Sequence, residues 1–341
     1  MTPARSKTAV KALIVPQKNA TPRVDERPDP KPRAGEARIR MKAAALNRRD
    51  VFIRRGLYPG IQWPVLGGSD GCGVVESVGD PAHADWVGRR VVIDPSLNWG
   101  DDPRVQGPDY SILGMPHPGT FAEYLCVSVH NLYDAPAHLT DHQAAALPLA
   151  GLTAWRAVMT RARLKPDEKV LVTGIGGGVA LAAMQLAQAA GASVWVTSSS
   201  PAKLEAAGRL GARGGFRYTE DDWRRQASKA AGGFDVIIDG AGGRGFGELV
   251  RLLAPAGRLA FYGGTAGKWP AILPQHLFFK QVDILASTMG SHAEFAALCP
   301  FVETHGVVPV VDRVFGLDEG AAAFDRLEAG EQFGKVVLAI G

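Results

Sequence analysis

The stretch that decides the fold runs from Lys169 to Ala190, KVLVTGIGGGVALAAMQLAQAA. It opens with the apolar run Val170–Val172, which is rich in β-branched residues and too short for a helix. We therefore expect a strand buried on both faces, as in parallel sheets. A glycine-rich turn follows at once, and apolar residues then recur at helical spacing as far as Leu186. The stretch predicts strand, turn and helix, the first part of a βαβ unit.

The glycine turn predicts a phosphate site. Gly174, Gly176, Gly177 and Gly178 allow the backbone to bend tightly and to approach a pyrophosphate, and the helix N-terminus at Val179 presents free N–H groups to it. A glycine-rich loop by itself often only turns the chain. The flanking strand and helix favour the phosphate interpretation, and we expect a dinucleotide-binding fold.

The next predicted strand, Val194–Thr197, indicates which dinucleotide binds. An NAD-binding protein usually has an acid at the end of this strand, whereas this chain has three serines, Ser198–Ser200, and then Lys203. Hydroxyls and an ammonium suit a ribose 2′-phosphate, so the predicted cofactor is NADP(H). The alternative is a serine that caps the next helix before Pro201, with Lys203 as an ordinary surface lysine. Capping uses one serine only, so both interpretations can hold.

Composition narrows the class of protein. The 341 residues are 46% hydrophobic and 21% charged with a net charge of +4, which suits two globular domains and gives no basic patch for nucleic acid. The three cysteines, Cys72, Cys126 and Cys299, are far apart and predict neither disulfides nor a metal knuckle. The N-terminus to about Thr8 is predicted as a loose tail without a signal peptide, and no apolar run is long enough to span a membrane. We expect a cytoplasmic protein.

The order of predicted elements changes near Pro136. Before it, short strands separated by glycine and proline predict an all-β half. After it, helices alternate with strands, which predicts a doubly wound parallel sheet in an α/β fold. The expected strands of this second half, after Val170–Val172, are Ser193–Thr197, Phe216–Tyr218, Phe234–Asp239, Arg258–Gly263 and Val282–Ser287.

These features resemble the medium-chain dehydrogenase/reductase superfamily. The resemblance covers nearly the whole chain and rests on the glycine loop and on four further motifs, Ala45–Asp50, Gly68–Val75, Gly119–Tyr124 and Leu147–Ala154. It implies a GroES-like all-β catalytic domain over 1–135, a Rossmann NADP-binding domain over 136–289, and a return to the catalytic domain over 290–341.

The resemblance also implies where zinc ligands would stand. The zinc alcohol dehydrogenases of this superfamily have cysteine at the position of Asn47, histidine at Ser69, usually glutamate at Asp70, and a second cysteine at Ala150. Only Asp70 could serve here, and one carboxylate does not make a site. The segment 94–119, where the structural zinc lobe would fall, has no cysteine. We therefore expect no metal and no zinc.

What remains is similar to the zinc-independent, quinone oxidoreductase-like branch. Its Asn-x-x-Asp pattern matches Asn47–Asp50, and Arg55–Pro59 is also similar. The cofactor contacts that this branch implies fall on Ser199, Lys203 and Tyr218. Gly240, Gly263, Gly264 and Thr265 follow predicted strands at the edge where ligands bind in open α/β folds, and we expect them along the cofactor as well. Lys335 stands where the family often has a basic residue near the cofactor, with an ordinary edge-strand lysine as the alternative.

The expected reaction is hydride transfer to a small electrophilic acceptor, a quinone or an α,β-unsaturated carbonyl compound. Asn47 and Tyr58 are the predicted catalytic residues, as donors to the developing oxyanion, and Asn47 could instead fix the nicotinamide ribose. The alternatives are that Asn47 only caps a helix over Arg48–Ile53 and that Tyr58 only lines the site. Two rival functions stay open: a zinc-type alcohol dehydrogenase acting on alcohols and aldehydes, and a non-catalytic NADPH-binding sensor. The resemblance implies a homodimer formed through the sheet edge at Val282–Ser287.

Overall fold

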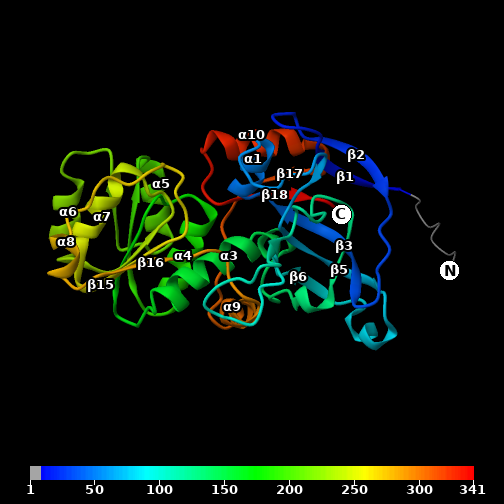
Figure 1. Ribbon diagram of the computed structural model, residues 1–341, viewed down its shortest axis with the longest axis horizontal. Coiled ribbons are helices and arrows are strands. Elements are labelled where there is room, and N and C mark those ends of the chain that lie inside the picture. Colours follow the sequence, from blue (N-terminus) through cyan, green and yellow to red (C-terminus); the bar gives the residue numbers. More distant parts are fainter. Residues whose placement is uncertain (1–8) are drawn as a thin grey trace. The chain divides into compact units, whose positions relative to one another are not determined.

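The computed structural model describes residues 9–341, and the tail predicted up to Thr8 lies outside them (Figure 1). The chain divides into two compact units. The first contains the residues up to Leu149 together with Ser291–Gly341, and the second is Ala150–Gly290. The sequence analysis places the first boundary after residue 135. Residues 136–149 instead belong to the first unit, because helix α2 (Asp141–Ala145) packs on strands of its main sheet.

The first unit is built mainly from short strands, as its glycine- and proline-rich sequence predicts. Its largest sheet has the order β10-β6-β5-β3-β18-β17, with β9 also paired to β3. A smaller sheet has the order β2-β1-β4, and β7 pairs with β8. The bounds are β1 Ala9–Val15, β2 Arg23–Pro28, β3 Glu36–Ala45, β4 Val65–Leu66, β5 Asp70–Val78, β6 Arg90–Ile93, β7 Ser96–Leu97, β8 Ser111–Ile112, β9 Tyr124–Ser128, β10 Leu132–Asp134, β17 Val311–Gly316 and β18 Lys335–Ala339.

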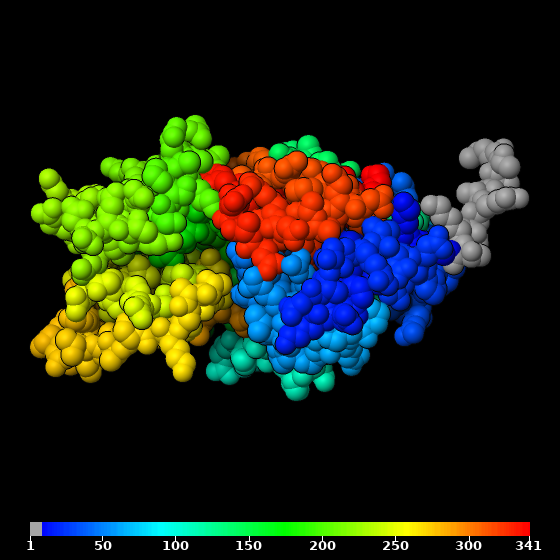
Figure 2. Space-filling model, turned by 90° about the horizontal axis from the view of Figure 1, so that it is seen from above, coloured from blue at the N-terminus to red at the C-terminus, as the bar shows by residue number. Residues whose placement is uncertain are grey.

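The C-terminal segment completes this sheet, as the resemblance implies. Strand β18 pairs antiparallel with β3, with Val337 opposite Ala45, and Figure 2 shows the C-terminal segment in red and orange beside the N-terminal strands in blue. Phe324 of α10 packs edge-on against Phe121, and both side chains are buried in the same core cluster. The remaining helical elements of the unit are α1 Arg48–Arg54, α9 His292–Thr304, α10 Gly320–Ala329 and the 3-10 turns Pro81–Trp86, Val129–Asn131 and Leu317–Glu319.

The second unit is a six-stranded parallel sheet with the order β13-β12-β11-β14-β15-β16. This is the doubly wound order of dinucleotide-binding folds, whose ligands bind where the chain reverses direction, here between β11 and β14. The predicted fold class, an α/β Rossmann-type sheet with a GroES-like all-β domain, is confirmed. The strands are β11 Lys169–Val172, β12 Ser193–Ser198, β13 Gly214–Arg217, β14 Phe234–Asp239, β15 Leu253–Phe261 and β16 Asp283–Ala286.

Helices pack on this sheet through alternating apolar residues. Leu171, Ile237 and Leu259, from three neighbouring strands, share a buried cluster with Phe246 of α7. The chain passes from the first unit into the second within α3. The helical elements are α3 Pro148–Trp155, a π-helical segment Arg156–Arg161, α4 Gly178–Ala189, α5 Pro201–Arg209, α6 Trp223–Ala231, the 3-10 turn Gly243–Gly245, α7 Phe246–Leu252 and α8 Gln275–Phe278. Of the helices described, none is both long and apolar enough to cross a bilayer.

Strand β13 begins two residues earlier than the sequence predicts, because two glycines belong to it. A Cβ on Gly214 would lie 2.8 Å from the ring of Trp195, and one on Gly215 would lie 3.0 Å from Leu204. These two glycines are needed because neighbouring side chains pack against the strand, and not because the chain turns there. A local sequence pattern does not distinguish the two cases.

Candidate functional site

Three side chains from distant parts of the first unit meet at one end of its central strands. The Lys335 ammonium donates to Asn47 Oδ1 at 2.5 Å and to Asp70 Oδ2 at 2.7 Å. The Asn47 amide also donates to Asp70 Oδ2, at 2.9 Å, and the backbone N–H of Leu149 donates to Asp70 Oδ1 at 2.6 Å. We call Asn47, Asp70 and Lys335 the polar cluster.

Strand pairing explains why these residues meet. Ala45 at the end of β3 lies opposite Asp70 on one side and Val337 on the other, and Asn47 follows two residues after Ala45. Lys335, two residues before Val337, therefore reaches the same point. All three side chains of the polar cluster are buried, so the lysine and aspartate charges must compensate each other.

The backbone at Asn47 is held by Asp50. Asn47 stands at the N-cap position of α1, and its own N–H donates to Asp50 Oδ2 at 2.7 Å, while the N–H of Gly68 donates to Asp50 Oδ1 at 3.4 Å. Burial raises the pKa of the Asp50 carboxyl. The predicted capping position is confirmed, but the Asn47 side chain also bonds Asp70 and Lys335, so it does more than begin a helix.

Arg49 fixes the loop beside the polar cluster. Its guanidinium is buried and donates to Ser69 Oγ at 3.3 Å and to three carbonyl oxygens, those of Ile112, Leu113 and Met115. The half-buried ring of Tyr58 lies 5.1 Å from the Arg49 guanidinium carbon. Within the described residues Tyr58 thus contacts Arg49 and makes no hydrogen bond to the polar cluster.

The residues at the positions that the resemblance assigns to zinc do not fit the metal. Asn47 offers an amide, and the Ser69 hydroxyl donates to the Leu113 carbonyl at 2.7 Å. Across residues 9–341, no three side chains of His, Cys, Asp or Glu are grouped so that they could hold a metal ion. A catalytic zinc site needs three such protein ligands.

The cysteines do not alter this conclusion. Burial raises the pKa of Cys72 and Cys299 to about 12 and that of Cys126 to about 11. Within residues 9–341, none of the three belongs to a group of side chains that could hold a metal ion. They are buried or half-buried structural residues, as the sequence predicts.

In the second unit, the predicted glycine loop connects β11 to α4. Gly174 has φ +64° and Gly176 has φ +119°, conformations that favour glycine. A Cβ on Gly174 or Gly177 would meet no protein atom within 4 Å, so the loop faces open space. Helix α4 begins at Gly178, followed by Val179, and its N-cap Gly177 has no side chain to occupy the first N–H groups. The loop therefore fits a pyrophosphate.

The serines after β12 divide their tasks. Ser198 is buried and its Oγ accepts from the N–H of Ser200, while Ser200 caps α5 by accepting from the N–H of Lys203 at 3.4 Å. Ser199 and Tyr218 are exposed beside them. These residues fit the phosphate prediction. Ser198 and Ser200 bond the backbone, and Ser199 is the exposed serine of the three.

Arg217 is an addition that the sequence analysis does not single out. It lies opposite Ser198 in the register of β12 and β13, and it is exposed. Its guanidinium is 4.0 Å from the Glu220 carboxylate. A cation beside the serine run strengthens the fit to a phosphate.

The expected residues at the ends of β14 and β15 fall into two groups. Gly240 and Gly263 pack closely: a Cβ on Gly263 would lie 2.7 Å from the Gly240 carbonyl oxygen, and one on Gly240 would lie 2.5 Å from the Tyr262 hydroxyl. Gly264 and Thr265 are exposed, and a Cβ on Gly264 would meet nothing within 4 Å. The first two therefore have a packing role, whereas the second two are exposed, as the predicted contact with the cofactor requires.

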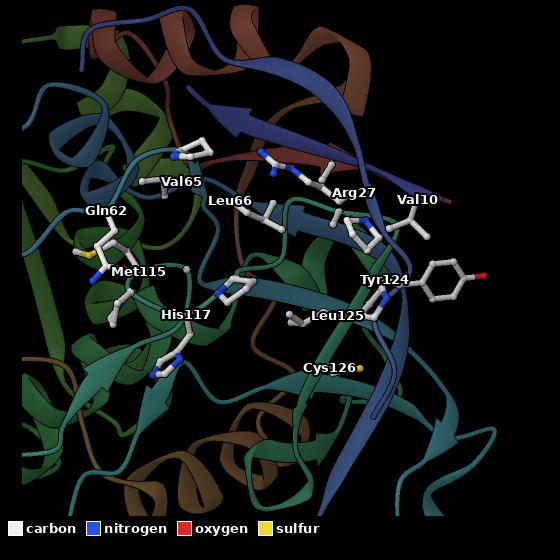
Figure 3. Close-up of a pocket in the computed structure, with 18 residues that line it drawn as sticks. Val10, Arg27, Gln62, Val65, Leu66, Met115, His117, Tyr124, Leu125 and Cys126 are labelled. Atoms are coloured by element: carbon white, nitrogen blue, oxygen red, sulfur yellow. The ribbon is translucent and has the colours of Figure 1, made fainter. Parts of the chain in front are cut away.

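A separate cavity of about 360 Å³ lies in the first unit and contains none of the expected site residues (Figure 3). Its wall is largely aliphatic side chains and prolines, and the ionisable groups along it are Arg27, His117, Tyr124 and Cys126. The labelled side chains come from β1, β2, β4, β9 and the segments around Gln62 and Met115. It is distinct from the polar cluster.

The sequence indicated Asn47 as a candidate residue but not the side chains to which it is hydrogen-bonded. Sequence reasoning selected Asn47, and it considered Asp70 only as a metal ligand and Lys335 only as a cofactor contact. The two are separated by 265 residues, so only strand pairing could show that they share a hydrogen bond. Arg49 lies two residues after Asn47, and no sequence pattern indicates that its side chain is buried.

Comparisons with known proteins agree with the fold. Two family descriptions match: "Alcohol dehydrogenase GroES-like domain" over residues 33–137 and "Zinc-binding dehydrogenase" over residues 178–304. The zinc-type alcohol dehydrogenase-like protein YogA of Leptosphaeria maculans is 37% identical over 338 residues, covering 91% of this chain and 92% of that protein. Human quinone oxidoreductase is 30% identical over 321 residues, covering 91% and 90%.

Solved structures extend the comparison to the whole fold. A crystal structure described as an NAD-dependent alcohol dehydrogenase superposes with a TM-score of 0.90 at 36% identity, covering 97% of this chain and all of that one. The relatives thus include proteins named for zinc-type alcohol dehydrogenase and for quinone reductase, and they share both units with this chain. The chain belongs to the medium-chain dehydrogenase/reductase superfamily and is an oxidoreductase of that family.

Proposed function

We propose that this protein is an NADPH-dependent reductase of quinones or α,β-unsaturated carbonyl compounds that works without zinc. The observation that carries the proposal is the polar cluster, in which an amide and a carboxylate stand at positions that the resemblance assigns to zinc ligands, and an ammonium donates to both. Without a metal to polarise an alcohol or simple carbonyl, the acceptor must already be electron-poor. The likeness to human quinone oxidoreductase supports this choice.

The choice of NADPH is supported by the second unit. The open glycine loop suits a pyrophosphate, and Ser199, Lys203, Arg217 and Tyr218 gather hydroxyls and cations without an acid in the serine run. When bound, NADPH would supply the hydride. Gly264 and Thr265 would lie along the cofactor.

The first unit would hold the acceptor. Asn47 would donate a hydrogen bond to the carbonyl oxygen as negative charge develops on it. Tyr58 would line the acceptor site, where its ring is held against Arg49. The proton needed to complete the reduction would come from solvent.

The test is NADPH oxidation with 9,10-phenanthrenequinone and with a simple enone, measured beside NADH and beside the metal content of the purified protein. We expect turnover with NADPH, weaker use of NADH, and substoichiometric zinc. Asn47→Ala should lower kcat by about 100-fold while NADPH affinity stays unchanged. Unchanged turnover in Asn47→Ala would remove the residue from the mechanism.

A second candidate function is alcohol oxidation, favoured by the names of the zinc-type relative and of the NAD-dependent structure. Stoichiometric zinc together with alcohol-dependent reduction of NAD⁺ would establish it. Tight NADPH binding without turnover of any acceptor would instead indicate a non-catalytic sensor.

A further inference from the structure

The Lys335 ammonium is placed between two residues at positions that the zinc relatives use near their metal. Its side chain is 6% exposed, and it donates to both Asn47 Oδ1 and Asp70 Oδ2. The Asp70 side chain is fully buried, and its second oxygen is occupied by the N–H of Leu149. A single positive charge therefore sits in the polar cluster, balanced by a single carboxylate.

We propose that this ammonium takes over the electrostatic task of the missing metal and that Lys335 is a catalytic residue. The inference rests on the proposed function, because it assigns Lys335 to the acceptor carbonyl of that reaction. It departs from the sequence-based expectation that Lys335 contacts the cofactor.

The hydrogen bonds determine which protons remain for a substrate. An ammonium only donates and a carboxylate only accepts, so together they orient the Asn47 amide with its oxygen toward Lys335 and its nitrogen toward Asp70. Among the described residues this leaves one N–H of the Asn47 amide and one N–H of the Lys335 ammonium without an acceptor. Two adjacent donors, one of them charged, suit an oxyanion.

The reduction step then balances without a metal. Hydride adds to the β carbon of the enone, the electrons of the double bond shift toward the carbonyl, and the oxygen becomes an enolate oxyanion. The two free N–H groups hold this oxyanion by hydrogen bonds. A proton from solvent then adds to the α carbon, which gives the saturated carbonyl compound.

Asp70 has a different part in this arrangement. Its carboxylate pairs with the buried ammonium and holds it in place, so Asp70 is a positioning residue. Removing Lys335 alone would leave Asp70 as an unpaired buried charge and could disturb folding. The test therefore needs a variant in which both charges are removed together.

The experiment compares Lys335→Met, Asp70→Asn/Lys335→Met and Lys11→Met with the wild type. Lys11 is an exposed lysine that faces Asp318, and its replacement is the matched control. Measured are kcat and KM for phenanthrenequinone and an enone, NADPH affinity by fluorescence titration, and thermal unfolding. We expect both Lys335 variants to lose about 100-fold in kcat with unchanged NADPH affinity, the double variant to unfold near the wild-type temperature, and Lys11→Met to behave as the wild type.

Chemical rescue distinguishes the effect of the Lys335 charge from the effect of the volume that its side chain fills. In Lys335→Ala, added propylammonium should restore part of kcat, whereas 1-propanol of the same length should not. A wild-type kcat in the folded double variant, weaker NADPH binding at constant kcat, or equal rescue by the alcohol would each overturn the assignment. If the wild type itself reduces no acceptor, the proposed function fails first, and the two failures are thereby distinguished.

Discussion

At the scale of single residues, Ser198 and Ser199 are neighbours with different environments. Ser198 is buried and its Oγ accepts from the backbone N–H of Ser200, whereas Ser199 is exposed. We predict that Ser199→Asp weakens NADPH binding by roughly tenfold, about 1.4 kcal/mol, because a carboxylate would repel the 2′-phosphate. NADH binding should not change. Fluorescence titration with both dinucleotides measures this.

The control for this prediction is Ser199→Asn, which is similar in size to the aspartate variant and uncharged. It should retain the preference for NADPH. Equal loss of NADPH and NADH binding in Ser199→Asp would show that the residue does not meet the 2′-phosphate.

Residue identities alone indicated much of the candidate site. Asn47, the glycine loop and the serine run could be selected because each lies in a local pattern with a known chemical use. The hydrogen bonds of Lys335 could not, because they depend on the register of β18 against β3, which forms between segments nearly 300 residues apart. The sequence also does not show which glycines are needed for packing and which face open space. A Cβ on Gly263 would press on backbone, whereas one on Gly177 would meet no protein atom within 4 Å.

At the scale of elements, that contrast between glycines makes a prediction. Gly177→Ala adds a methyl group where no protein atom lies within 4 Å, at φ −79°, so stability should change by less than about 1 kcal/mol. NADPH affinity should fall at least roughly tenfold, because the methyl group occupies space needed by the pyrophosphate. Gly263→Ala should instead destabilise the fold by about 1–3 kcal/mol, since its Cβ would press on the Gly240 carbonyl.

Urea unfolding and NADPH titration of both variants measure these effects. A Gly177→Ala protein that binds NADPH normally would place the phosphates elsewhere. An equally stable Gly263→Ala protein would mean that β14 and β15 can separate at their ends without cost.

Helix α9 is joined to Asp94, the residue after strand β6, by an ion pair that depends on pH. His292 Nδ1 lies 2.5 Å from Asp94 Oδ2, and the hydrogen bond to Asp94 raises the pKa of His292 above its ordinary 6.5. A histidine with a raised folded-state pKa contributes stability that is complete below about pH 6.5 and is lost as the pH rises through the raised value. We therefore predict that His292→Gln lowers the urea midpoint more at pH 6 than at pH 9.

The comparison needs wild type and variant at both pH values, because other groups also titrate over this range. His130→Gln is the matched control, since the His130 side chain is exposed. A His292→Gln effect of the same size at pH 6 and pH 9 would contradict the ion-pair interpretation.

At the scale of the whole molecule, the sequence predicted the alternation of elements better than the unit boundary. The strands of the second unit were identifiable from β-branched runs of the right length, and Phe234–Asp239 matches β14 in full. The boundary was predicted near residue 135 because the composition changes there. The first unit instead extends to Leu149, because α2 packs on β3 and β5. Composition reports which elements form, and packing decides to which core they belong.

Among the residues that the structure describes, one edge of the parallel sheet has no partner strand, which predicts self-association. Strand β16 is last in the order of its sheet, and α8 before it exposes Phe278 and, just after, Phe279, which are 56% and 77% exposed. Open edges with exposed aromatic groups favour pairing with another chain, and we propose a second copy of this one.

Light scattering should give twice the mass of one chain for the wild type. Phe278→Glu/Phe279→Glu should be monomeric, because charged side chains would have to be buried at the interface. Val105→Glu, at a loop residue of the first unit with 53% exposure, should remain dimeric, and a monomeric wild type would contradict the proposal.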